Sequence, residues 1–375
     1  MFYYYGNSVY TPYPLMLFEE ARALVSKYFY VLHYEFDGFV PVFYIQPDGD
    51  LKSKFKEFAL EAKSRKLLPF LKKSNGYLTI RVLPFEPKRR NPKTPLLLFA
   101  ATFITVLIDG FLRASDSLLP EVLGHEVNVP LTTLAYALAL MAIVGIHEMG
   151  HKIASIIHGV RTSLPYFIPA PPGIGIGGTF GAVILQEEPP TNKDELFDIG
   201  FSGPVFGFLA TIVVMLVAAR VTGIVSIEQL KAWTEQGYVF VYIPTPVLMD
   251  IILSYYRPLP GPNYVYYLHP LAFVAWAGFI ITALNLFPVW QLDGGHVIRA
   301  LVGPKRARLL SIAGVVVLFI LGYWMMALIL LLFMMIGGKP VEPLDNVSPL
   351  STSRKLLIIV YLIILILCLP APLYG

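Results

Sequence analysis

Residues 131–158 read LTTLAYALALMAIVGIHEMGHKIASIIH, and this stretch decides the fold. It is apolar over about 20 residues, the length that one helical crossing of a bilayer requires. It also contains His147-Glu148-Met149-Gly150-His151, whose two His side chains, four residues apart, lie on one face of a helix and can share a metal ion. Ionisable groups at membrane depth are costly and are functional candidates by default. The stretch therefore predicts a membrane-spanning helix that carries an intramembrane metal site.

The residue beside the first of these histidines is a glutamate. In an HExxH pattern this carboxylate lies next to the metal, where it is a candidate general base for a water molecule. The competing interpretation is a helix end at which His and Glu side chains meet lipid headgroups. A third metal ligand further along the chain would favour the metal site.

The composition indicates a membrane protein with many spans. Hydrophobic residues make up 56% of the chain and charged residues only 14%, whereas soluble domains carry roughly a quarter charged residues. The net charge of +4 is too small to indicate a nucleic-acid partner. A single cysteine, Cys368, excludes an intrachain disulfide and a zinc site built from cysteines.

Residues 1–93 are expected to form a small α+β domain. Helical spacing over 15–28 and 51–67 alternates with two predicted hairpins, which turn at Asp37-Gly38 and Asn75-Gly76. The order helix–hairpin–helix–hairpin predicts a duplicated unit with a four-stranded sheet. The second helix carries a basic face, which we interpret as solvated surface and not as a binding patch: Lys52, Lys56, Lys63 and Lys66.

Residues 94–375 are expected to form a polytopic α-helical membrane domain of about six spans. The predicted spans are 94–112, 131–158, 199–220, 270–289, 307–336 and 355–369. Basic residues before the first span (Lys88, Arg89, Arg90 and Lys93) and after the fourth (Arg299, Lys305, Arg306 and Arg308) mark the cytoplasmic side. We therefore expect a multi-pass protein of the cell membrane with the 1–93 domain and both termini in the cytoplasm.

Two stretches between the spans are irregular. Residues 163–185 are apolar but interrupted by many Pro and Gly residues, and such backbone survives at membrane depth only against protein or a water-filled cavity. This favours a re-entrant loop and strand beside the site over an ordinary surface connector. Residues 222–269 form a long outside segment, in which 238–255 is expected to lie at the membrane interface.

Asp293 is the third candidate ligand. It lies at the inner end of the fourth span, at the depth expected for His147 and His151, and two His with one carboxylate form a common catalytic zinc set. A helix-end turn before two glycines is the alternative for this residue. Asn285, in the same span, is either a donor to a developing oxyanion or a helix-packing residue.

These motifs together resemble the site-2 protease family of intramembrane zinc metalloproteases. The resemblance rests on HEMGH, on Asn285-Leu286-Phe287-Pro288 and on Leu292-Asp293-Gly294, with further likeness at 178–181 and 202–204. It covers about 131–301, which would be the catalytic core. It implies zinc ligands at His147, His151 and Asp293, Glu148 as the base, and Asn285 as a transition-state helper.

The resemblance predicts a zinc metalloendopeptidase that cleaves membrane proteins within or near their transmembrane segments. Its partners would then be substrates with a transmembrane helix and the lipid bilayer, and not nucleic acid. A zinc-binding membrane receptor or scaffold without activity, or a metal transporter, remains the alternative. Two hypotheses follow for the neighbourhood of the site: His296 supports Asp293, and a strand within 179–185 pairs with an unwound substrate.

Overall fold

The computed structural model describes residues 15–47, 49–86, 90–171, 173, 175–336 and 341–370. Lys88 and Arg89, two of the basic residues used to orient the first predicted span, lie outside these ranges, as does Pro172 of the irregular 163–185 stretch.

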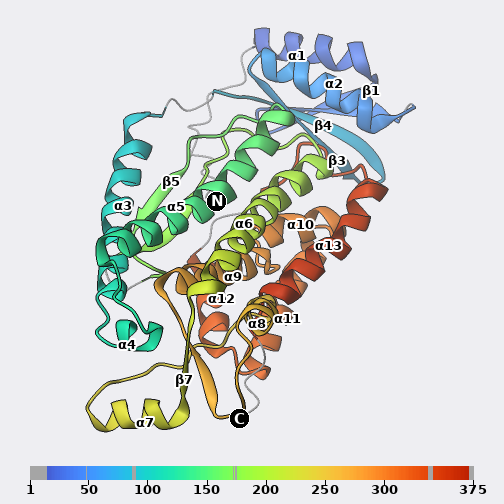
Figure 1. Ribbon diagram of the computed structural model, residues 1–375. Helices are drawn as coiled ribbons and strands as arrows, with labels where there is room; N and C mark the ends of the chain where they lie inside the picture. Colours follow the sequence, from blue (N-terminus) through green and yellow to red (C-terminus); the bar gives the residue numbers. More distant parts are fainter. Residues whose placement is uncertain are drawn as a thin grey trace.

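The first described part of the chain is a four-stranded antiparallel sheet with two helices packed on it (Figure 1). Its elements are α1 Leu15–Tyr28, β1 Tyr30–Asp37, β2 Val40–Gln46, α2 Leu51–Ser64, β3 Leu67–Ser74 and β4 Tyr77–Pro84. The order β1-β2-β4-β3 joins the two hairpins through β2 and β4. Gly38 and Gly76 have positive φ in the two turns, as the Asp-Gly and Asn-Gly pairs predict. Phe43, Phe55 and Ile80 are fully buried between sheet and helices.

Three helices among the described residues are long and apolar enough to cross a membrane. They are α3 Lys93–Ala114, α5 Val129–Ile157 and α6 Lys193–Val221. α5 packs against both α3 and α6, and α9 Pro270–Leu286 packs on α6 and α5 (Figure 1). Close packing of α5 on α6 uses Gly150, because a side chain there would lie 2.7 Å from the carbonyl oxygen of Ser202.

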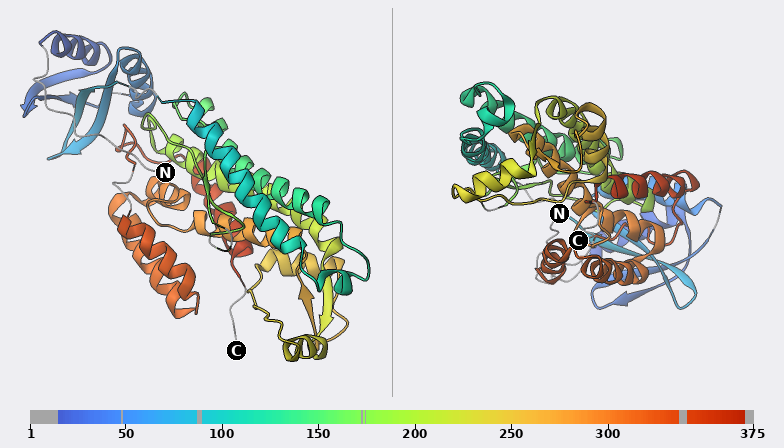
Figure 2. Two further views of the ribbon diagram at one scale, coloured as in Figure 1. Left: turned by 90° about the vertical axis from the view of Figure 1, so that its left-hand side faces the viewer. Right: turned by 60° about the horizontal axis from the view of Figure 1, so that its bottom comes forward.

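The predicted span 307–336 is not one helix. It forms two helices, α11 Pro304–Ile320 and α12 Trp324–Ile336, which contact each other and lie side by side (Figure 2). Gly322 stands between them with φ of +83°, a conformation that glycine adopts without strain and that ends a helix. The sequence is apolar on both sides of this glycine, so hydropathy alone predicts one span where the structure has two helices. The last helix, α13 Thr352–Cys368, has 17 residues, as does α9.

The irregular stretch 163–185 contains a two-stranded antiparallel sheet of β5 Tyr166–Pro169 and β6 Thr179–Val183. Its glycine-rich loop lies directly against two long helices. The Thr105 hydroxyl of α3 donates to the Gly178 carbonyl at 2.8 Å, and a side chain at Gly177 would meet the Tyr136 hydroxyl of α5 at 2.7 Å. Such contacts agree with the expectation that irregular backbone here is covered by protein.

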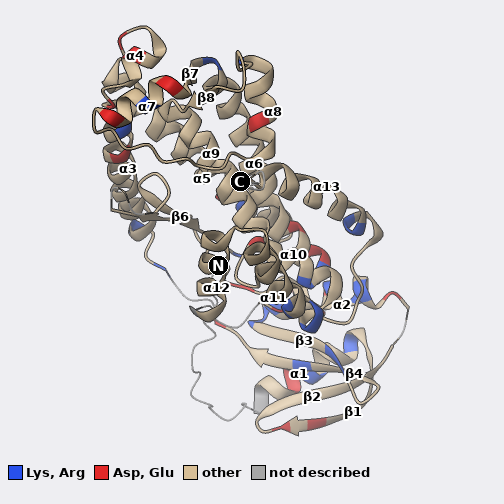
Figure 3. Ribbon diagram, turned by 90° about the horizontal axis from the view of Figure 1, so that it is seen from below, with Lys and Arg blue, Asp and Glu red and all other residues tan. Residues whose placement is uncertain are grey.

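The segment that follows α6 is rich in exposed apolar side chains. Its elements are β7 Gly223–Ser226, α7 Ile227–Glu235, α8 Val247–Tyr256 and β8 Tyr264–Tyr267. Val239, Val241, Tyr242 and Tyr255 are among its most exposed residues. Acidic residues lie on α7 and on the short helix α4 Leu119–Leu123, and Lys and Arg gather around α2 and α11 (Figure 3). The predicted orientation rests on the basic residues at the span ends, of which Lys305, Arg306 and Arg308 lie on α11.

The basic face predicted for the second helix is not plain solvated surface, so that prediction is wrong for three of the four lysines assigned to it, all three of which lie on α2. Lys52 pairs with Asp194 at 2.7 Å, Lys56 with Glu195 at 3.2 Å and Lys63 with Glu188 at 3.8 Å. The acidic partners lie in the first turn of α6 and in the segment before it. A lysine stripe has the same pattern whether it faces water or acidic residues some 130 positions away, so the sequence could not distinguish the two.

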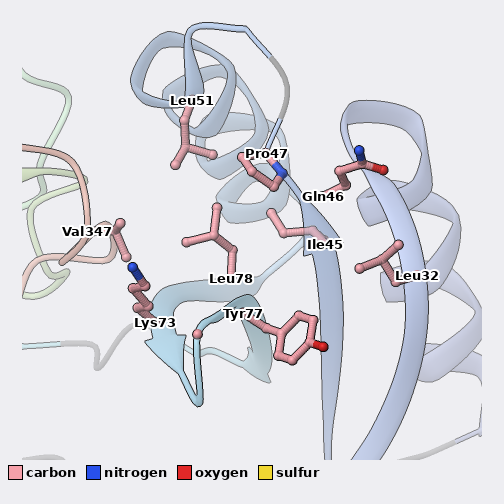
Figure 4. Close-up of a pocket in the computed structure, with 10 residues that line it drawn as sticks. Leu32, Ile45, Gln46, Pro47, Leu51, Lys73, Tyr77, Leu78 and Val347 are labelled. Atoms are coloured by element: carbon pink, nitrogen blue, oxygen red, sulfur yellow. The ribbon is translucent and has the colours of Figure 1, made fainter.

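Residues 341–350 connect α12 to α13, and we call them the strap. The Leu344 carbonyl accepts from the Leu71 amide of β3 at 2.8 Å, and the Leu344 amide donates to Pro190 at 2.9 Å. The strap thus joins the edge of the N-terminal sheet to the segment that leads into α6. A cavity of about 440 Å³ opens beside it. Figure 4 shows its lining, with Leu78 pointing inward and Val347 of the strap at one side.

Candidate metal centre

Two ligand candidates lie on α5, in the helix that the sequence predicts. The helix begins after Asn128, whose side chain accepts from the Leu131 amide at 3.1 Å, and Pro130 occupies its first turn. It ends at Ile157, so HEMGH lies in its C-terminal part. His147 and His151 are both buried on the face that α6 covers.

The third candidate, Asp293, is the first residue of α10 Asp293–Val302. Its Oδ2 atom lies 3.2 Å from Nε2 of His147 and 3.2 Å from Nε2 of His151. The two Nε2 atoms are themselves 3.2 Å apart. Three candidate ligand atoms from two distant parts of the chain therefore converge on one point.

The orientation of His151 is fixed from the side away from this point. Its Nδ1 lies 2.6 Å from the carbonyl oxygen of Ile199 on α6. A carbonyl can only accept, so Nδ1 carries the proton and Nε2 directs its lone pair at the point that it shares with Nε2 of His147 and Oδ2 of Asp293. Ile199 has no signal in the sequence, because a backbone carbonyl is available at every residue.

α6 approaches the imidazoles closely because glycines face them. A side chain at Gly203 would lie 2.1 Å from Nε2 of His151, and one at Gly207 would lie 2.9 Å from Nδ1 of His147. Gly200 similarly faces α10, where a side chain would be 3.1 Å from the Asp293 carbonyl oxygen. Small residues at 202–207 permit close helix contact, but the sequence does not show that this contact is with the two histidines.

Asp293 stands at a helix end before two glycines, as its alternative interpretation had it, but it begins a helix, α10. The two glycines after it allow this helix to pack closely on the chain that leaves α9. Side chains at Gly294 and Gly295 would lie 2.1 Å from the Leu286 carbonyl oxygen and 2.2 Å from that of Val289. The backbone at 286–289 and the start of α10 are therefore packed together, which sets the place of Asp293.

The two predicted catalytic residues also lie at this centre. Glu148 directly follows His147 on α5 and is buried. The Asn285 amide nitrogen lies 3.5 Å from Nε2 of His147, so this side chain faces the same space from α9. The structure thus brings together all five residues singled out from the sequence.

His296 is a different case. It is buried one turn after Asp293, but neither ring nitrogen has a hydrogen-bond partner among the described residues. The hypothesis that His296 supports Asp293 through a hydrogen bond is therefore not supported by any contact among the described residues. Packing of its Cβ atom against Gly200 of α6 is what the structure does show.

The donor set fits a zinc ion. Imidazole nitrogens and a carboxylate oxygen are ligands that zinc accepts, and catalytic zinc sites use three protein ligands with a fourth position left for water or substrate. Here one ligand atom from each of His147, His151 and Asp293 lies within 4.8 Å of the others. Zinc–ligand bonds of about 2 Å are compatible with donor atoms that are this close together.

A family model describes this part of the chain. The model of "Peptidase family M50" matches residues 135–332, which is more than half of the sequence and includes all five residues of the centre. No solved structure matches the chain significantly.

Curated relatives match over a longer stretch. The chain is 28% identical over 247 residues to "Probable zinc metalloprotease EGY2, chloroplastic" of Oryza sativa subsp. indica, covering 63% of this chain and 42% of that protein. It is 26% identical over 283 residues to the EGY2 protein of Arabidopsis thaliana, covering 72% and 48%. To "Probable zinc metallopeptidase EGY3, chloroplastic" of Arabidopsis thaliana it is 24% identical over 336 residues, covering 82% and 56%. The chain thus spans about half the length of the curated relatives it matches.

Proposed function

The chain belongs to peptidase family M50, and from this premise we propose that it is a zinc metalloprotease that cleaves membrane proteins within or beside their transmembrane segments. The predicted likeness to the site-2 proteases is thereby confirmed at the level of the family. The observation that carries the activity is the convergence of His147, His151 and Asp293 with Glu148 beside them. The relatives described above are named as zinc metalloproteases, which supports zinc as the metal.

His147, His151 and Asp293 would hold the zinc ion. When bound, zinc would lower the pKa of a water molecule toward neutral and would act as a Lewis acid on the peptide carbonyl. Ile199 keeps His151 in the tautomer that leaves Nε2 free for the metal. The packing of α6 on the imidazoles excludes bulk water from that side of the centre.

The chain's other residues divide the proton and charge handling between them. Glu148 takes a proton from the attacking water and can pass it to the leaving amine, since both events occur beside one carboxylate. The Asn285 amide, which already faces the centre, donates to the oxyanion that develops on the peptide carbonyl. The base must lie beside the metal site and the oxyanion donor must face it, and Glu148 and Asn285 occupy these two positions.

The substrate class follows from where the centre lies. HEMGH is on a 29-residue apolar helix that packs between two others of membrane length. We therefore take membrane proteins with a transmembrane helix as substrates and the bilayer as the surroundings, with cell-membrane placement and both termini in the cytoplasm. The basic residues after α9, of which Lys305, Arg306 and Arg308 lie on α11, support this orientation (Figure 3).

The alternative is a membrane protein that keeps the metal without activity, as a receptor, scaffold or transporter. A structural zinc site is closed by protein ligands and needs no base. Here three ligands leave a position open, and Glu148 is buried beside them. These two features favour the protease.

Replacement of Glu148 by Gln distinguishes the protease from a membrane protein that binds zinc without activity. The purified variant should retain about one zinc ion per chain, because Glu148 is not a ligand, and should lose cleavage of a single-span test substrate by several hundredfold or more. Elemental analysis and a gel-based cleavage assay measure the two quantities. Cleavage by the variant at nearly the wild-type rate would overturn the mechanism, and wild-type protein that binds zinc but cleaves no membrane substrate would favour the alternative.

A further inference from the structure

Glu342 of the strap makes two ion pairs of different character. Its Oε1 accepts from Nη2 of Arg299 at 2.9 Å, and its Oε2 lies 3.3 Å from Nζ of Lys72. The Arg299 side chain is only 7% exposed, whereas that of Lys72 is 49% exposed. One carboxylate thus connects a buried cation of α10 with an exposed cation of β3.

Arg299 lies in the same short helix as the metal ligand Asp293. α10 has ten residues, so it is about 15 Å long, and the first residue supplies the ligand while Arg299 lies near the last turn. A helix this short moves as one body. Its start is held by the close contacts of Gly294 and Gly295, and one side by Gly200 of α6. The ion pair with Glu342 holds the other end.

The strap is itself firmly placed. Besides the bonds of Leu344, the Asp345 amide donates to the Thr191 carbonyl at 2.7 Å, and the Asn346 amide donates to the Leu71 carbonyl at 3.3 Å. Leu344 is buried in the core of the N-terminal sheet and its helices. Glu342 is therefore anchored between the sheet and the segment that leads into α6.

We propose that Glu342 and Arg299 are positioning residues for the metal centre, which hold α10, and with it Asp293, in the place required for zinc binding. This inference rests on the proposed function. It makes the strap, and through it the N-terminal sheet, part of what determines the geometry of the centre. Neither residue belongs to the group of candidate ligands.

The physical reason is the cost of a buried charge without a partner. A guanidinium that is removed from water and loses its carboxylate must regain hydration or another acceptor. For Arg299 this requires the last turn of α10 to turn or to move away from the strap. Because α10 moves as one body, Asp293 at its other end shifts relative to His147 and His151.

The test compares Glu342→Gln with Lys72→Gln in the purified full-length protein. Zinc affinity is measured by competition with a chromophoric chelator, and ligand geometry by the visible absorption of the Co²⁺-substituted protein. Glu342→Gln should weaken zinc binding about tenfold, the lower end of the range for residues that support metal ligands, and should change the Co²⁺ spectrum. Lys72→Gln removes only the exposed pair and should stay within about twofold of wild type.

Glu342→Asp guards against a variant that is merely unstable. It keeps the charge on a shorter side chain and should recover zinc affinity and the Co²⁺ spectrum at least in part. Unchanged affinity and spectrum in Glu342→Gln, or equal losses in Lys72→Gln, would overturn the inference while leaving the protease assignment intact. Failure of the wild-type protein to bind zinc would instead overturn the proposed function, so the two failures are distinguishable.

Discussion

Replacement of Gly203 by alanine places a methyl group in steric clash with the imidazole ring of His151. The added Cβ would lie 2.1 Å from Nε2, 2.4 Å from Cε1 and 2.5 Å from Cδ2 of that ring. Ordinary contacts of a Cβ atom begin near 3.4 Å, so the overlap exceeds 1 Å at the nitrogen that faces the metal. Either the ring or α6 must move by about that distance.

Neither movement is free. The ring of His151 is held by the Ile199 carbonyl at 2.6 Å, and turning it away removes one of three protein ligands. Displacement of α6 strains its ion pairs with α2 and carries the Ile199 carbonyl away from His151. Overpacking of this kind costs about 1–3 kcal/mol in stability, whereas an ångström of misplacement at a reacting centre can cost about 100-fold in rate. We therefore expect a folded protein with zinc affinity and cleavage each reduced at least about 100-fold.

Two further glycines supply a graded comparison. Gly207→Ala should be intermediate, since its Cβ would lie 2.9 Å from the far nitrogen of His147. Gly145→Ala should behave as wild type, because its Cβ would make an ordinary contact of 3.7 Å with Phe167. Zinc competition, a cleavage assay and thermal melting of the three variants test the order. If Gly203→Ala binds zinc and cleaves as well as Gly145→Ala, the packing of α6 on the ligands does not control the centre.

Three other predictions follow from the site and the topology. Asp293→Ala should lower zinc content and activity together, and full zinc retention in the presence of a chelator would remove this residue from the ligand set. In a Cys368→Ser background, an impermeant thiol reagent applied to intact cells should label Ser115→Cys and not Ser53→Cys; equal labelling would contradict the predicted orientation. Single prolines along β6 should abolish cleavage without loss of zinc in at least one alternate register, because proline cannot donate to a paired substrate strand. Full activity of every variant that retains zinc would leave β6 a purely structural strand.

Two of the three ligand candidates could be predicted from the sequence because their signal is local, whereas Asp293 was identified by its depth at a span end, its residue type and the family resemblance. HExxH specifies two side chains on one helix face, and the end of a span near Asp293 specifies depth without requiring any knowledge of packing. The same holds for the hairpins of the N-terminal sheet, where Asp37-Gly38 and Asn75-Gly76 encode their own turns. Features set by short-range stereochemistry were thus accessible.

The break at Gly322 and the partners of α2 were not accessible in the same way. One glycine between two apolar runs is compatible with a continuous span, and only the contact between α11 and α12 distinguishes a hairpin. Lysines of α2 form ion pairs with acidic residues of α6, and this pairing depends on how the N-terminal sheet and its helices pack against the end of α6. Such information belongs to the tertiary fold.

α6 shows why the long-range contacts matter to the chemistry. Its glycines leave a smooth surface against the imidazoles, and a surface without side chains fixes neither the rotation nor the axial position of a helix by interdigitation. Ion pairs at the first turns of α6 fix its position instead. Asp194 pairs with Lys52 and Arg354. Asp198 pairs with Arg354 at 2.6 Å and with His158 at 2.9 Å. Because Asp198 directly precedes Ile199, these ion pairs hold the carbonyl that orients His151. The charges at the end of α6 and the glycines along it are therefore two parts of one arrangement: the first sets the helix in place, and the second lets the ligands lie against it.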